Sequence, residues 1–173
     1  MGVEEADALL LIGVNPRVEA AVWNARIRKS WLWGNLKVGL IGEAVDLTYP
    51  YEHLGTSAAD LDKLASTDFF KVLKDAKRPM IVVGEGALCR ADGAKLSETV
   101  LKLSQSVTAV TEDWAGFGVL HSAAGRVGAL DVGFVPAEGG LATAEILSGG
   151  LSTVVLLGAD EVDLSSLGNS KVI

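Results

Sequence analysis

The feature that most constrains the fold is the unbroken apolar run Ala8–Ile12, which continues through Val14 after Gly13 and stops at Asn15-Pro16. An apolar run without alternation is typical of a strand covered on both faces, as in the middle of a parallel sheet. Asn15 is predicted to cap a helix, and Pro16 suits the first helical position because its missing N–H costs nothing there. The sequence therefore predicts a strand, a turn and a helix start at the edge of a sheet where α/β proteins bind ligands.

Four further apolar runs predict strands, at residues 37–42, 80–84, 107–111 and 153–158. Helical patterns lie between these runs, which favours right-handed crossovers and parallel pairing. We therefore expect an α/β fold with three layers and a mostly parallel, Rossmann-like sheet of about five strands. With 173 residues the chain is expected to form a single domain over residues 1–173.

Local signals place the helices. Residues 16–33 read as one helix with three tryptophans within eleven residues, which favours a core or interface role for them. Ser57 followed by Asp60 resembles a capping box, and Ser66 or Thr67 can cap the next helix. Cys89 lies in a largely apolar helical run and is interpreted as a small core residue.

Charge and cysteine content exclude several function classes. The formal net charge of −7 argues against nucleic-acid binding, which needs a clustered positive face. Cys89 is the only cysteine, so this chain alone offers no disulfide, no thiolate zinc site and no cysteine ligation of an iron–sulfur cluster. The acidic start is unlike a targeting segment, and no apolar run approaches the ~20 residues of a membrane span.

Two glycine-containing turns are the candidate ligand site. Gly84-Glu85-Gly86 begins like G-x-G-x-x-G, but Cys89 stands where the third glycine belongs. Glu43 and Asp46 follow a strand, where an acid often binds ribose hydroxyls, yet the glycine fingerprint that should accompany such an acid is missing. These turns are the candidates for a ligand cleft, with the residues Gly13, Asn15, Pro16, Gly84 and Gly86.

No catalytic residue and no metal ligand is predicted. His121 and Ser122 are adjacent, which invites a hydrolase interpretation, but neighbouring helical residues point to different faces and no G-x-S-x-G elbow occurs.

Four segments, residues 6–31, 37–55, 73–84 and 154–160, carry a family likeness in order along the chain. They resemble the large iron–sulfur subunit of respiratory complex I, the 75 kDa or G-type subunit of NADH:quinone oxidoreductase, in its molybdopterin-oxidoreductase-like region. The motifs NPR, starting at Asn15, and NARIRKSW, starting at Asn24, are the most specific part of the resemblance.

The resemblance implies a structural, non-catalytic part of the peripheral arm, supporting electron transfer from NADH to quinone through iron–sulfur clusters bound elsewhere in the subunit. Related molybdenum enzymes bind a pterin dinucleotide at turns like Gly13 to Pro16 and Gly84 to Gly86, whereas the complex I branch resembles a scaffold that has lost that cofactor. The resemblance therefore implies that the candidate cleft at these turns is vestigial. The implied partners are other peripheral-arm subunits and the iron–sulfur part of the same subunit, with no nucleic acid and no direct membrane insertion. The implied location is peripheral to a respiratory membrane, on the matrix side in mitochondria or the cytoplasmic side in bacteria, and the chain resembles a fragment or a split-gene product.

Two alternatives remain open. Residues 77–128 also resemble the central domain of thiamine-diphosphate enzymes, which would make the chain a nucleotide- or flavin-binding module. The other alternative is a molybdopterin-binding oxidoreductase fragment. Under the scaffold hypothesis, the apolar run at residues 153–158 expects cover from other parts of the assembly, and Arg26, Arg28 and Lys29 are candidate polar contacts.

Overall fold

The computed structural model describes residues 2–123, 125–159 and 162–173. The chain divides into two compact units, Met1–Ser122 and Ala123–Ile173, and each is described here by itself. The prediction of a single domain over residues 1–173 stays a prediction. Asp160, the last residue of the segments that carry the family likeness, lies outside the described residues.

The first unit is built on a five-stranded sheet in the order β3-β2-β1-β4-β5, with every neighbouring pair parallel. The strands are β1 (Ala8–Ile12), β2 (Lys37–Ile41), β3 (Glu52–Gly55), β4 (Pro79–Gly84) and β5 (Phe117–Leu120). All five residues of β1 and all six of β4 are buried, which explains why both read as continuous apolar runs. The predicted fold class is therefore confirmed.

The strand order reverses between β1 and β4. Ala8 lies opposite Lys37 of β2 on one side and opposite Pro79 of β4 on the other, so these strands end at the same edge. In doubly wound sheets such a switch point is where ligands bind. The turns that follow β1 and β4 are therefore neighbours, as the vestigial-cleft hypothesis expects.

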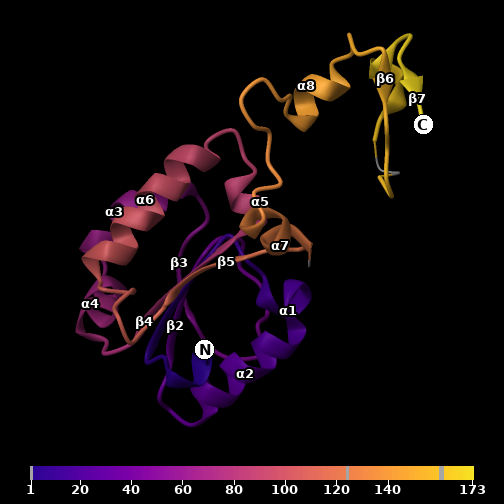
Figure 1. The fold of residues 1–173 in the computed structure, drawn as a ribbon. Coiled ribbons are helices and arrows are strands. Elements are labelled where there is room, and N and C mark those ends of the chain that lie inside the picture. Colours follow the sequence, from indigo (N-terminus) through magenta and orange to yellow (C-terminus); the bar gives the residue numbers. More distant parts are fainter. Residues whose placement is uncertain (1, 124, 160–161) are drawn as a thin grey trace. The chain divides into compact units, whose positions relative to one another are not determined.

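Helices cover the two faces of the sheet (Figure 1). One layer holds η1 (Val3–Glu5), α1 (Pro16–Glu19) and α2 (Ala21–Leu32); the other holds α3 (Ala58–Lys63), η2 (Leu64–Ser66), α4 (Asp68–Asp75), α5 (Glu85–Leu88) and α6 (Gly93–Ser106). Ile27 of α2 packs on Leu9 and Leu11 of β1. Leu73 of α4 packs on the opposite face of the same strand, beside Leu10.

The predicted helix starts are largely confirmed. Ser57 and Asp60 form the capping box, and the Ser57 hydroxyl donates to the Asp60 carboxylate at 2.8 Å. This hydrogen bond is the main reason that the pKa of Asp60 falls to about 2. The Thr67 hydroxyl caps α4 by accepting from the Phe70 amide. The single helix expected at 16–33 is two helices, because Ala20 has non-helical dihedral angles of φ −150° and ψ 66°.

The predicted fourth strand at residues 107–111 is wrong. Thr108 has a left-handed φ of 56°, which ends any extended run, and the strand at this edge is β5 instead. Two contacts place it there: the Trp114 indole N–H donates to the Pro79 carbonyl at 2.8 Å, and the Gly116 carbonyl accepts from the Ile81 amide at 2.7 Å. His121 and Ser122, which the sequence reading placed on a helix, follow β5 outside any helix, and the next helix begins at Gly125.

Two smaller expectations also fail. β3 is missing from the predicted strands, since its residues are at most half-buried at the edge of the sheet and carry no apolar run. Cys89 is exposed rather than part of the core, because α5 ends at Leu88 and the chain turns there before α6.

The second unit contains α7 (Gly125–Asp131), α8 (Thr143–Leu147), β6 (Thr153–Val154), η3 (Leu164–Leu167) and β7 (Lys171–Val172). The fifth strand predicted at 153–158 is wrong in extent and in pairing. Only Thr153–Val154 is a strand, and it pairs in parallel with β7 in a separate two-stranded sheet. Gly158 follows with a left-handed φ of 62°, and Leu157 is 96% exposed.

Candidate functional site

The two glycine turns at the switch point touch each other. A Cβ atom added at Gly84 would lie 2.1 Å from the carbonyl oxygen of Gly13, and one added at Gly13 would lie 2.7 Å from the Ala87 Cβ. Gly13 also has a left-handed φ of 56°, so a side chain there would be strained as well as crowded. Gly86 has open space around its Cα and takes no part in this contact. The structure therefore brings Gly13 and Gly84 together by packing one backbone directly on the other.

Asn15 does not cap α1 with its side chain, so the predicted cap is wrong. Its backbone N–H instead donates to the Glu19 carboxylate at 2.5 Å. The side-chain oxygen of Asn15 is buried without a hydrogen-bond partner among the described residues. Pro16 does occupy the first helical position. The Glu19 carboxylate thus occupies the amide that an anionic ligand would otherwise use.

A cavity of about 270 Å³ opens beside this turn, lined by Gly13, Val14, Asn15, Glu19, Glu43 and Val45. Its charged lining consists of two carboxylates and includes no lysine or arginine among the described residues. The phosphates of a pterin dinucleotide would meet negative charge here instead of cations and free amides. These residues do not fit such a cofactor.

Asp46, the second candidate ribose acid, is already bonded within the protein. Its carboxylate accepts from the Thr48 amide at 2.9 Å and from the Arg17 guanidinium at 2.5 Å. These two contacts, the amide first, lower the pKa of Asp46. Glu43 remains at the cavity, whereas Asp46 ties the loop after β2 to α1.

The NPR and NARIR motifs hydrogen-bond to the loop after β2, and we call this set of contacts the loop clamp. The Asn24 amide group donates to the Leu47 carbonyl at 3.1 Å, and the Tyr49 hydroxyl donates to the Asn24 side-chain oxygen at 2.8 Å, both buried. Burial raises the pKa of the Tyr49 phenol well above its usual value. Arg28 donates to the carbonyl of Thr48, whose φ of 72° is unusual for threonine. Sequence reasoning missed the loop clamp, because the bonded residues are 20 or more positions apart in the sequence.

Glu85, His121 and Ser122 meet where β4 and β5 end. Glu85 is 9% exposed and accepts hydrogen bonds from both the amide and the hydroxyl of Ser122, at 2.8 and 2.9 Å. His121 Nδ1 lies 3.8 Å from the same carboxylate. The serine hydroxyl therefore donates to an acid instead of to a histidine base, which is not the arrangement of a nucleophile.

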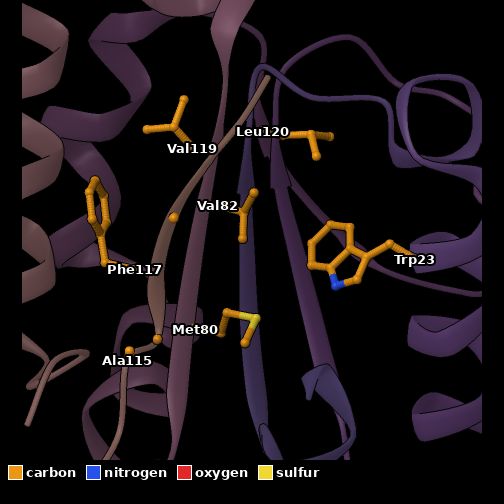
Figure 2. A pocket seen from close by; sticks show the side chains of 9 residues that line it. Trp23, Met80, Val82, Ala115, Phe117, Val119 and Leu120 are labelled. Atoms are coloured by element: carbon orange, nitrogen blue, oxygen red, sulfur yellow. The ribbon is translucent and has the colours of Figure 1, made fainter. Parts of the chain in front are cut away.

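An apolar hollow of about 230 Å³ lies on the α2 face of the sheet, over β4 and β5. Figure 2 shows Met80, Val82 and Leu120 pointing toward Trp23, while Phe117 and Val119 point to the opposite face. Gly118 lies between Phe117 and Val119. A Cβ atom added at Gly118 would have no heavy atom within 4 Å, so the hollow is unfilled beside this residue. The described residues that line the hollow offer no charged group to orient a polar ligand.

Strand order, helical layers and switch-point turns together define a doubly wound α/β protein. The chain belongs to the molybdopterin oxidoreductase family, whose model matches residues 1–173.

Similar proteins are components of respiratory complex I. The chain is 48% identical to the mitochondrial 78 kDa subunit of NADH-ubiquinone oxidoreductase from Neurospora crassa, over 93% of this chain and 21% of that protein. It is 41% identical to the mitochondrial NADH dehydrogenase [ubiquinone] iron-sulfur protein 1 of Solanum tuberosum, over 96% of this chain and 22% of that protein. It is 38% identical to the G-type subunit of NADH-quinone oxidoreductase from Rickettsia bellii, over 99% of this chain and 24% of that protein.

These comparisons confirm the resemblance to the large complex I subunit, and they show that the chain spans less than a quarter of each relative. Within the residues that the structure describes, no helix is both long and apolar enough to cross a membrane. In the same residues, no group of three or more histidine, cysteine, aspartate or glutamate side chains could hold a metal ion.

Proposed function

We propose that this chain is a structural, non-catalytic part of the peripheral, NADH-oxidising arm of complex I, and that it holds no cofactor of its own. The observation that carries the proposal is the switch point itself. There Gly84 packs against the Gly13 carbonyl, and the Glu19 carboxylate binds the Asn15 amide at 2.5 Å. A site used for a phosphate-bearing cofactor needs open backbone and free donors at this place.

The similarity to complex I subunits supports the wider role in this proposal. In this proposal the electrons pass through iron–sulfur clusters in the remainder of the subunit, and this domain holds neighbouring parts in place. Its partners are that remainder and other peripheral-arm subunits. It lies at the matrix side of the mitochondrial inner membrane, or at the cytoplasmic side of a bacterial membrane. Residues 1–173 form one molybdopterin-oxidoreductase-like domain of a larger or split subunit.

Metal and pigment analysis of the purified chain tests the absence of a cofactor. We expect less than about one-tenth of an equivalent of molybdenum, iron, pterin or flavin per chain, which is the level of adventitious binding. Stoichiometric pterin with molybdenum would instead favour an oxidoreductase fragment, and stoichiometric flavin would favour the nucleotide-binding alternative.

Assembly tests the structural role. In the intact subunit, Glu43→Gln should leave NADH oxidation by the assembled arm unchanged, because the cavity carries no chemistry in this proposal. Removing residues 1–122 should prevent the arm from assembling. Normal assembly without these residues would overturn the structural role, and loss of activity in a fully assembled Glu43→Gln arm would overturn the non-catalytic one.

A further inference from the structure

The outward face of α2 is apolar, which is unusual for a surface helix. Asn24, Ile27 and Ser30 face the sheet and are buried. On the opposite side Val22 is 79% exposed and Leu32 is 61% exposed. A helix that covers one face of a sheet normally presents charged residues to water on the other. α2 therefore packs one side on the sheet, and the apolar side chains on its other side are uncovered among the described residues.

The outward residues follow a helix-packing spacing. Val22, Ala25, Lys29 and Leu32 are separated by three or four positions, which places them in one ridge along the helix, and Trp33 continues it with 60% exposure. Ala25 is small, so another helix could approach closely at the middle of the ridge. We call Val22, Ala25, Lys29, Leu32 and Trp33 the α2 ridge.

Charge on α2 has a single sign. The helix carries Arg26, Arg28 and Lys29 and no carboxylate, in a chain whose net charge is −7. Arg26 makes two hydrogen bonds to Glu4, at 2.6 and 2.7 Å, and Arg28 donates to the Thr48 carbonyl, so both side chains are directed back onto the protein.

Lys29 is the cation of the ridge itself. Its ammonium lies 4.7 Å from the centre of the Trp33 ring. The Arg26 hydrogen bond and, to a smaller extent, the charge of Lys29 lower the pKa of Glu4, but Lys29 forms no ion pair within 4 Å among the described residues. Of the three candidate polar contacts, Lys29 is therefore the one that no hydrogen bond or ion pair among these residues holds against the protein.

We propose that the α2 ridge docks an α-helix of another protein that presents an apolar stripe bordered by carboxylates, one of them opposite Lys29. The inference rests on the proposed structural role and names the docking face. Charge complementarity favours a helix bordered by carboxylates over a second copy of the chain or a lipid surface. A second copy docked ridge to ridge would bring Lys29 against the same lysine of the other copy. A lipid surface is disfavoured because Arg26 and Arg28 are already bonded inside the protein.

Binding of designed helices tests the occupant. The probes are two fluorescent peptides of about 20 residues, long enough to be helical, with the same leucine stripe bordered either by glutamates or by lysines. Fluorescence anisotropy with the full chain should show the glutamate-bordered peptide binding at least about tenfold more tightly. Equal affinities, or no binding by either peptide, would overturn the proposal. So would a stable dimer of the chain, or tighter binding to vesicles of phosphatidylcholine and phosphatidylserine.

A matched pair of variants locates the site. Ala25→Glu places a carboxylate in the middle of the ridge and should weaken the glutamate-bordered peptide at least about tenfold. Ala94→Glu makes the same change at an exposed position of α6 and should leave binding unchanged. Both variants should unfold at the parent temperature, because both positions are exposed.

The intact subunit separates this inference from the proposed function. Ala25→Glu should impair assembly of the peripheral arm, whereas Ala94→Glu should not. Normal assembly of both variants, together with failed assembly when residues 1–122 are removed, would overturn the ridge and leave the structural role standing.

Discussion

The two units of the chain differ in how their apolar side chains are used. In Met1–Ser122, both faces of the sheet carry a cluster of fully buried residues. In the described part of Ala123–Ile173 the buried apolar residues are Val154 and Leu167, while Phe134 is 83% exposed. About 50 residues with so small a core cannot offset the entropy of ordering the chain. Apolar composition alone therefore does not make a stable unit, because stability follows from the apolar area that the fold buries.

Hydrogen exchange gives the largest expected contrast between the units. Amides of β1 should exchange only by global unfolding, whereas the Ile173 amide, which donates to the Val154 carbonyl at 3.0 Å, should exchange by local opening. With a stability of about 5–15 kcal/mol for the first unit, the rates should differ by at least about a thousandfold. Mass spectrometry of the exchanging chain measures both. Similar protection in the two units would contradict the comparison.

Two phenylalanines test the same difference in burial between the two units. Phe69 is 2% exposed and its ring packs over Gly39, so Phe69→Ala should cost about 3–5 kcal/mol in urea unfolding followed by circular dichroism. Phe134→Ala removes the same atoms from a side chain that is 83% exposed and should change the unfolding free energy by less than about 0.5 kcal/mol. A cost above about 2 kcal/mol for Phe134→Ala would show that the second unit has a core of its own.

The buried pair Asn24 and Tyr49 tests the polar part of the first unit. Tyr49→Phe leaves the Asn24 side-chain oxygen buried without its donor and should cost about 1–2 kcal/mol. Because burial raises the pKa of the Tyr49 phenol, the folded protein keeps a proton that the unfolded chain loses above about pH 10. Stability should therefore fall as pH rises above that value, and Tyr49→Phe should remove this part of the fall. An unchanged alkaline limb in the variant would argue against the buried phenol as its source.

Much of the first unit was predictable because its central strands are covered on both faces. β1, β2 and β4 read directly as apolar runs, and the starts of α3 and α4 follow from the capping residues Ser57 and Thr67. The edges were not predictable in the same way. β3 is half-exposed and reads as a loop, and residues 107–111 have the composition of a strand but turn at Thr108. Edge strands are held by particular tertiary contacts, here the Trp114 hydrogen bond to Pro79, which no local pattern contains.

The sequence predicted where the two candidate turns lie, but not how they pack or which groups occupy their amides. Glycines after β1 and β4 indicated where two turns meet, since strands of one parallel sheet end at one edge. That the Gly84 backbone would pack on the Gly13 carbonyl, and that Glu19 would bind the Asn15 amide, depends on distances that spacing does not give. The glutamate four positions after Asn15 was the available signal for the second contact, because a carboxylate one turn into a helix can reach its first amides.

The smallest expected effect distinguishes two helix starts within the first unit. Thr67→Ala removes a hydroxyl that accepts from the Phe70 amide at 3.2 Å, so it should cost about 1 kcal/mol, the usual loss for a helix cap. Asn15→Ala removes a side-chain oxygen that is buried without a partner in the described residues, while the backbone bond to Glu19 remains, so stability should change by less than about 0.5 kcal/mol. Urea unfolding of both variants beside the parent chain measures the difference. A loss of about 1 kcal/mol or more for Asn15→Ala would mean that the Asn15 side chain does cap α1. The hydrogen bond from the Asn15 amide to Glu19 would then not be the contact that satisfies this helix start, and Glu19 would be less able to block an anionic ligand there.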